Sequence, residues 1–275
     1  MRLLLFSLIS FFCSLVITTT IVLAENKIYI TQIGDSDDTE ININQKGDDN
    51  IVELSMNHDD NILDFDQEVT GTSTGSNIIS WVTYWGSGLS WGGDLDGTGN
   101  QIKIKQWQNK GTNTNRVGFH IPTNDNSVDI CQGGIFSSST DTTCSFDSQE
   151  YGGHTANLDL HNGGADVRIS QTTGTNSSRS EGHYVQVYTY GGDDADVFVH
   201  QRGNGDKKAY ITIRSDDSSV DLVQKSDGDH TATIDLRGSY GTDLTLRQDS
   251  QSDQTYSLTN NCQTSGGCTV DVTQN

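Results

Sequence analysis

The feature that most constrains the fold is a five-residue pattern, apolar–any–apolar–any–glutamine, that recurs along the whole chain. A spacing of two places the three marked side chains on one face of a β-strand. A glutamine on a buried face is costly unless both halves of its amide are hydrogen-bonded, and stacked like strands allow this because each glutamine can bond the one above and the one below. The sequence therefore predicts a repeat protein with a glutamine ladder. The glutamines of the ladder are Gln32, Gln45, Gln67, Gln106, Gln132, Gln171, Gln201, Gln224, Gln248 and Gln274.

Strands of the same period, but with a different fifth residue, lie between the glutamine strands. Counting the segment at Ile28 among them gives eighteen strands, or about nine strand–turn–strand repeats. In the regular stretches one repeat takes 22 to 26 residues, and a fixed period of this size is typical of a solenoid. We expect an all-β, two-sheet parallel β-solenoid with loop insertions. A sandwich or barrel is the alternative, but it does not require the same side chain at the same point of every second strand.

The first 24 residues have the features of a secretory signal peptide. Met1 and Arg2 are followed by an apolar stretch, and Val22, Leu23 and Ala24 precede a cleavage site. The apolar stretch is also long enough for a membrane anchor, which is the alternative. We expect cleavage after Ala24, a single domain over 25–275, an extracellular or cell-surface location, and no stable membrane span in the mature chain.

Four cysteines remain after this cleavage, and they form two sequence-local pairs in a chain sent to an oxidising compartment. This favours the disulfides Cys131–Cys144 and Cys262–Cys268. A zinc site is the alternative, but no histidine lies at ligand spacing near either pair.

The charge and composition exclude one class of partner and locate the insertions. A formal charge of −21 leaves no basic surface for nucleic acid. The low apolar content of 32% borders on that of disordered chains, but such chains do not keep a strand period over their whole length. The repeats are interrupted at about 71–100, which is rich in Gly, Ser and Trp, and at about 135–153. Both segments are expected to be loops that project from the coil.

The turn after Gln45 carries a recognisable motif, Gln45-Lys46-Gly47-Asp48-Asp49-Asn50. It resembles the curlin repeat of bacterial curli fibres, and the segment from Gln201 through Gly203 to Asp206 is similar to it with Asp in place of Asn. Gln32 and Gly34 open a further copy. The resemblance implies turn roles for Gly34, Gly47, Asn50 and Gly203, and an extracellular fibre subunit with an amyloid-like coil.

Candidate catalytic and metal-binding residues are few. Gly88-Leu89-Ser90-Trp91-Gly92 matches G-x-S-x-G, but its flanks do not predict the strand and helix of a nucleophile elbow. The seven histidines are scattered, so we expect them on the surface or in turns. We expect neither an enzyme nor a cofactor or metal site. Calcium stays open at the acidic doublets, which are Asp37-Asp38, Asp48-Asp49, Asp59-Asp60, Asp193-Asp194 and Asp216-Asp217.

The ends of the repeat region suggest a function. The first strand begins at Ile28 and the last ends at Gln274, and neither end shows the polar capping repeat of a monomeric solenoid. Both terminal strands would offer unpaired backbone groups to another subunit. We expect a secreted structural subunit of a curli-like functional amyloid or surface fibre, in adhesion or biofilm matrix, that self-associates and could take up other fibre subunits. The alternative is a monomeric surface β-solenoid adhesin whose insertions bind glycans or a host surface, through aromatic residues such as Trp81, Tyr84, Trp85 and Trp91.

Overall fold

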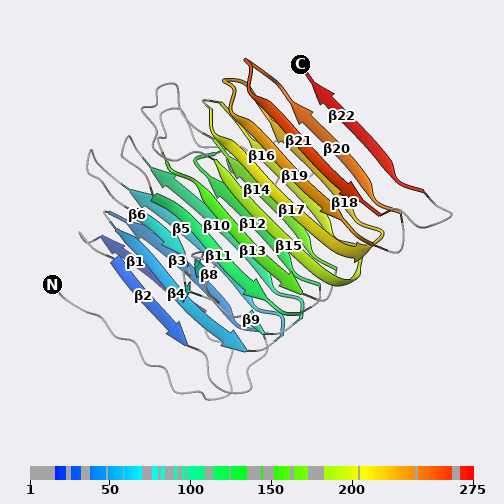
Figure 1. The fold of residues 1–275 in the computed structure, drawn as a ribbon. Coiled ribbons are helices and arrows are strands. Elements are labelled where there is room, and N and C mark those ends of the chain that lie inside the picture. Colours follow the sequence, from blue (N-terminus) through cyan, green and yellow to red (C-terminus); the bar gives the residue numbers. More distant parts are fainter. Residues whose placement is uncertain are drawn as a thin grey trace.

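The protein is an all-β, two-sheet parallel β-solenoid in the computed structural model (Figure 1), which confirms the predicted fold class. The structure describes residues 16–22, 26–31, 38–47, 49–57, 59–69, 76–79, 82–83, 90–91, 95–96, 98–108, 114–123, 125–134, 144, 152–161, 164–172, 183–203, 205–238, 241–261 and 267–275. Predicted residues outside these ranges include Gln32, Gly34 and Cys262. Within the described ranges, no helix is long and apolar enough to cross a membrane.

One sheet, which we call the glutamine sheet, contains every described glutamine of the pattern at the end of a strand. Its strands, in spatial order, are β1 (Val16–Val22), β3 (Glu40–Lys46), β5 (Ile62–Val69), β10 (Gln101–Gln108), β12 (Ser127–Gln132), β14 (Asp166–Gln171), β16 (Asp196–Gln201), β18 (Ser219–Gln224), β20 (Asp243–Gln248) and β22 (Thr269–Gln274). All neighbours are parallel, and from β3 to β22 each glutamine is the direct partner of the next.

The second sheet contains the strands that lack the glutamine. Its spatial order is β2 (Asn26–Thr31), β4 (Asn50–Asn57), β6 (Ser76–Ile79), β11 (Thr114–Ile121), β13 (Thr155–His161), β15 (Tyr184–Asp193), β17 (Lys207–Asp216), β19 (His230–Leu236) and β21 (Gln254–Asn260). Chain order therefore alternates between the sheets, and Figure 1 shows like strands stacked along the coil axis. The strand β2 belongs to this sheet, as expected for the segment at Ile28.

The core lies between the two sheets and consists of the inward positions of both strand types. Ile102, Ile104, Val117 and Phe119 are typical members, and all are fully buried. Because parallel neighbours are in register, the apolar residues of one strand lie beside apolar residues of the next, as Ile104 does beside Phe65 and Ile130. The continuous apolar column explains how a chain with a low apolar content builds a core.

The first predicted insertion contains one of the expected second-sheet strands and three further short strands. Its residues Ser76–Ile79 form β6, which belongs to the second sheet. The short strands β7 (Val82–Thr83) and β8 (Ser90–Trp91) pair with each other in antiparallel fashion, and β9 (Leu95–Asp96) pairs with β4. Ser90 of the G-x-S-x-G match therefore lies in β8.

The acidic doublets have a local structural role that the sequence pattern did not reveal. The second aspartate of each doublet has a positive φ, between 46° and 62°: these residues are Asp38, Asp49, Asp60, Asp194 and Asp217. Aspartate is one of the few residues other than glycine that adopt this left-handed conformation, because its short side chain can bond locally. Gly47, with φ of 138°, has the same freedom at the predicted turn. After Gln201 the positive φ values fall at Gly205 (54°) and Asp206 (50°).

The turn between β17 and β18 offers a test of this role, because Asp217 is exposed and has φ of 46°. Replacement by Val should destabilise the fold by about 1–2 kcal/mol, the cost of a left-handed conformation for a residue with a branched side chain. Replacement by Asn, which tolerates the same conformation, should leave stability within about 0.5 kcal/mol. Urea unfolding of the two variants measures the difference, and equal stability of D217V and wild type would disprove the role.

Candidate functional site

The glutamine side chains form a continuous hydrogen-bonded ladder through the coil. In each step the Nε2 of one glutamine donates to the Oε1 of the preceding one, and from Gln67 to Gln248 the distances are 2.8–3.1 Å. Gln274 donates to Gln248 in the same way. The glutamines from Gln45 to Gln248 are fully buried, whereas Gln274 is exposed. The ladder therefore has a direction, with donors pointing toward the N-terminal end of the coil.

The same amides also connect the two sheets. Each Nε2 has a second hydrogen, and this hydrogen points to a backbone carbonyl of the second sheet. Gln132 donates to Thr155 O at 3.0 Å, and Gln171 donates to Tyr184 O at 2.9 Å. The pattern extends to Gln248, which donates to Thr255 O at 3.1 Å. Each buried amide therefore contacts its neighbour along the coil and the opposite sheet across it.

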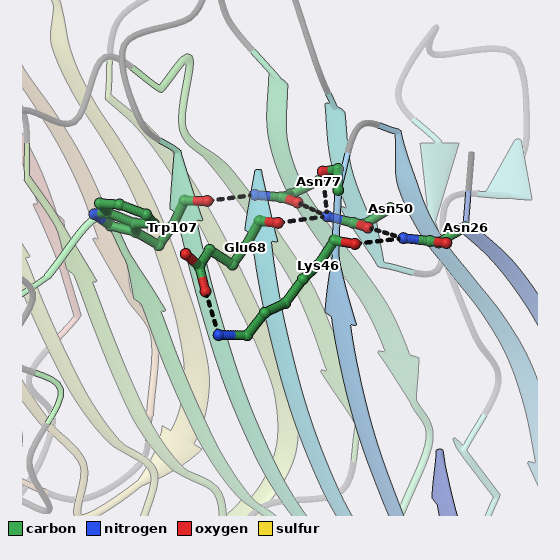
Figure 2. Close-up of polar contacts among 7 residues, drawn as sticks. Asn26, Lys46, Asn50, Glu68, Asn77 and Trp107 are labelled. Carbon is green, nitrogen blue, oxygen red and sulfur yellow. Dashed lines mark hydrogen bonds and ion pairs between the residues drawn. The ribbon is translucent and has the colours of Figure 1, made fainter. Parts of the chain in front are cut away.

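An asparagine row at the start of the second-sheet strands repeats this arrangement in the opposite direction (Figure 2). Asn26 Nδ2 donates to Asn50 Oδ1 at 2.8 Å, and Asn50 Nδ2 donates to Asn77 Oδ1 at 2.9 Å. Each asparagine also donates to the carbonyl that follows a ladder glutamine, at Lys46, Glu68 and Trp107. The predicted turn residue Asn50 thus connects the end of one strand to the start of the next as part of a buried row.

Histidine and lysine replace asparagine in the C-terminal half of this row. The strand register places His154, His183, Lys207 and His230 in the column of Asn115, and all four are buried. A ring nitrogen of His230 bonds Lys225 O at 2.9 Å, which is again the carbonyl after a ladder glutamine. The column residue after Gln201 is therefore Lys207, one position beyond the Asp206 that the motif predicted.

The expectation that the histidines lie at the surface is therefore wrong for most of those described. His154, His183, His200 and His230 are buried, and only His120 and His161 are partly exposed. His58 lies outside the described residues. For His154, His183 and His230 the sequence signal was their place directly before or at the start of a strand, where the first repeats carry asparagine. His200 lies near the end of β16 and gave no such signal.

His200 is buried on the outer side of the glutamine sheet. It continues the row Cys131–Ser170–His200, and the predicted disulfide Cys131–Cys144 fixes part of the second insertion to this row. Ser170 Oγ also donates to Gly134 O at 3.2 Å. Burial of His200, together with the positive charges of Lys225 and Arg202, lowers its pKa from 6.5 to about 4. Cys268 is also in a disulfide, although its predicted partner Cys262 lies outside the described residues.

The C-terminal end of the coil leaves interior positions uncovered. Val270 of β22 is 42% exposed, whereas its partner Leu244 in β20 is 1% exposed. Tyr256, Leu258 and Val272 are only partly buried. No described residue donates to Gln274 Oε1, so the glutamine ladder ends there in an open acceptor. Gln254 holds the asparagine-row position and donates to Asn275 O, which leaves the second hydrogen of its amide available.

The N-terminal end carries the complementary groups. Ile28 and Ile30 of β2 are only partly buried, like the apolar residues at the other end. Asn26 Oδ1 is buried and has no hydrogen-bond partner in the described part of the chain. Gln45 Nε2, the last donor of the glutamine ladder, bonds to the backbone carbonyls of Asn26 and Ile51 and has no glutamine beyond it. One end therefore combines an open asparagine acceptor with a glutamine donor, and the other combines an open glutamine acceptor with an amide donor.

The strand β1, from the predicted signal peptide, lies on the free edge of β3. Its backbone pairs with β3 from Glu40 to Lys46, and Ile21 stands opposite Gln45. In the uncleaved chain the backbone of Ile21 therefore occupies the strand position next to Gln45. Cleavage after Ala24 would remove β1 and free this edge of the glutamine sheet.

The interior of the ladder can be tested at Gln201. Replacement by Met keeps the approximate length of the side chain but leaves Gln171 Oε1 and Lys208 O without their donor. At about 1–3 kcal/mol for each buried polar group that loses its partner, the variant should lose several kcal/mol of unfolding free energy. Gln274→Met at the exposed end should cost less than about 1 kcal/mol in the monomer. Similar losses in chemical unfolding of the two variants would contradict the ladder's role.

The lowered pKa of His200 predicts acid sensitivity. A histidine that stays neutral in the fold contributes stability that is complete above the unfolded-state pKa of about 6.5 and is lost as the pH falls through the folded-state value. Between pH 7 and pH 4 this histidine should remove about 3 kcal/mol of unfolding free energy. His200→Gln should therefore show a shallower loss over this window when both proteins are unfolded in urea at several pH values. Parallel curves would show that His200 does not titrate as described.

Comparisons of the chain with protein-family models, with curated proteins and with solved structures each found no match. The geometry of the coil and of its two ends is therefore the basis on which a function can be inferred.

Proposed function

We propose that the mature chain is a secreted structural protein that stacks end to end into a surface fibre, serving adhesion or biofilm matrix. The observation that carries the proposal is the polarity of the two open rows. The glutamine row ends in a donor at Gln45 and an acceptor at Gln274, while the asparagine row ends in an acceptor at Asn26 and a donor at Gln254. Head-to-tail stacking sets Gln254 Nε2 against Asn26 Oδ1 and sets Gln274 Oε1 against Gln45 Nε2, which would exchange its bond to Asn26 O for one to the new glutamine. Head-to-head stacking pairs neither row.

The stacking of whole strands supports the same arrangement. After removal of β1, the N-terminal end begins with β2 in the second sheet, and the C-terminal end finishes with β22 in the glutamine sheet. At each end one sheet therefore extends half a turn of the coil beyond the other. The two offsets are complementary, so a second copy added head to tail continues both sheets without a gap. In that arrangement β2 of one copy extends β21 of the other, and β3 extends β22.

The apolar positions at the junction provide the driving force. Val270 and Val272 would be covered by Ile41 and Ile43 of the next copy, because all four residues occupy the corresponding columns of the glutamine sheet. Burial of half-exposed aliphatic side chains contributes about 25 cal/mol for each Å² removed from water. The ladders supply register and direction, since their buried amides are costly when left unpaired.

The test is assembly of the purified mature chain, residues 25–275. We expect unbranched fibres in electron microscopy and a strand spacing of about 4.7 Å in fibre diffraction. Val272→Asp should abolish assembly because it places a charge in the junction. Thr273→Asp, one residue further on the outer face of the same strand, is the matched control and should still form fibres.

A second comparison uses the leader. The uncleaved chain should assemble more slowly than the mature chain, because β1 occupies the edge of β3 that the next copy needs. A mature chain that stays monomeric at high concentration, or fibres that form equally well from V272D, would rule out the proposed junction.

A further inference from the structure

The outer face of the second sheet brings together three residues that are distant in the sequence. His120 lies on β11, and its direct partner on β13 is Asp159. His161 lies two residues beyond Asp159 on the same strand, so it faces the same side of the sheet. Within the described ranges, these three residues form the only group of three or more His, Cys, Asp or Glu side chains arranged closely enough to hold a metal ion.

The distances between their polar atoms suit a shared ligand. Nε2 of His161 is 3.1 Å from Oδ1 of Asp159, and Nε2 of His120 is 3.8 Å from Oδ2 of the same carboxylate. One possible ligand atom from each of the three residues lies within 4.8 Å of the other two. The imidazole rings are edge-on, with centroids 5.4 Å apart. All three side chains are partly exposed, so an ion could reach the group from solvent.

Neighbouring aromatic rings restrict the site on one side. His161 lies 6.3 Å from the ring of Tyr188 and 5.9 Å from that of Tyr190, measured between centroids. The two tyrosine rings are stacked at 6.4 Å, and the guanidinium of Arg214 lies over both of them. The two tyrosine rings limit the orientations that the imidazole of His161 can adopt. They also separate the positive charge of Arg214 from Asp159.

We propose that His120, Asp159 and His161 form a binding site for a divalent transition-metal ion of the Zn²⁺ class. Two imidazole nitrogens and one carboxylate are the donor set that suits zinc and related ions, whereas Ca²⁺ takes six to eight oxygen ligands. Three protein ligands on an open face leave room for water in the remaining position. The metal would join β11 to β13 on the outside of the coil.

This site is independent of the proposed fibre junction. It lies on the lateral face of the second sheet, whereas the junction involves the edges of β2, β3, β21 and β22. Loss of the metal site would therefore leave the end contacts in place, and failure of fibre assembly would leave the metal site intact.

The experiment is a titration of the mature chain with Zn²⁺, followed by calorimetry, and with Co²⁺, followed by its visible absorption bands. We expect one saturable site with nitrogen ligation. His120→Ala, Asp159→Asn and His161→Ala should each weaken binding by more than about 100-fold, since even partners that only orient a ligand contribute 10–100-fold. Asp235→Asn is the matched control, because Asp235 lies on the same outer face of β19, pairs with Arg237 and has no histidine in its ion pair.

Circular dichroism identifies any variant that does not fold. In that case the Co²⁺ spectrum of the wild-type chain still tests the proposal, because it reports directly whether nitrogen ligands bind the ion. Absence of saturable Zn²⁺ or Co²⁺ binding to the wild type would overturn the proposal. Equal affinity of folded wild type, D159N and H161A would also overturn it, because the ion would then bind elsewhere.

Discussion

The fold depends on a buried glutamine amide that is hydrogen-bonded in two directions at once. One hydrogen of each Nε2 points to the preceding glutamine and the other to the opposite sheet, as at Gln171, which bonds Gln132 Oε1 and Tyr184 O. A parallel pair of strands that shifted by one residue would break both bonds and would turn the apolar side chains outward. The amide thus specifies register, strand order and the distance between sheets. The hydrophobic core alone would fix none of these so sharply, because contacts between apolar side chains are non-directional.

The asparagine row shows that the coil requires a hydrogen-bond donor at the start of each second-sheet strand and tolerates different side chains as that donor. Its basic task is to supply a donor to the carbonyl that follows each ladder glutamine, as Asn50 does for Glu68 O. In the C-terminal half a ring nitrogen of His230 bonds Lys225 O, which follows the ladder glutamine of the preceding strand instead of the next one. The row can therefore change chemistry from amide to imidazole while the glutamine ladder continues unchanged. A direct amide-to-amide chain is seen from Asn26 to Asn77, which is the part of the chain closest to the curlin-like motif.

The repeated features of the fold, which are the strands and their pairing, could be predicted from the sequence. Features that depend on which residues become neighbours in space could not. The strands and their pairing followed from the glutamine period, because a buried amide in every second strand has few other solutions. The left-handed conformation of the aspartates was not predicted, since a doublet such as Asp216-Asp217 has the same composition whether it shapes a turn or binds calcium. Calcium binding at the doublets stays a prediction. The group of His120 and Asp159 was missed for a different reason. These residues are 39 positions apart, and the insertion at 135–153 obscures the register that makes them neighbours. Aligning residues by their distance from each strand start, rather than by sequence spacing, would have found both this group and the buried histidines.

The direction of the ladders has a consequence for any assembly of this protein. A stack of purely apolar strands could add a second copy in either orientation, because aliphatic contacts carry no polarity. Here the glutamine row and the asparagine row run in opposite directions, so a head-to-head contact would bring donors against donors in one row and acceptors against acceptors in the other. The open groups among them, which are Asn26 Oδ1, Gln254 Nε2 and Gln274 Oε1, would be buried without partners, at a cost of about 1–3 kcal/mol each. The leader strand β1 affects the same junction through the backbone, since it pairs with β3 and places Ile21 beside Gln45. In the proposed assembly, cleavage would therefore expose the edge and the ladder donor together, and fibre growth would be restricted both in direction and to the processed chain.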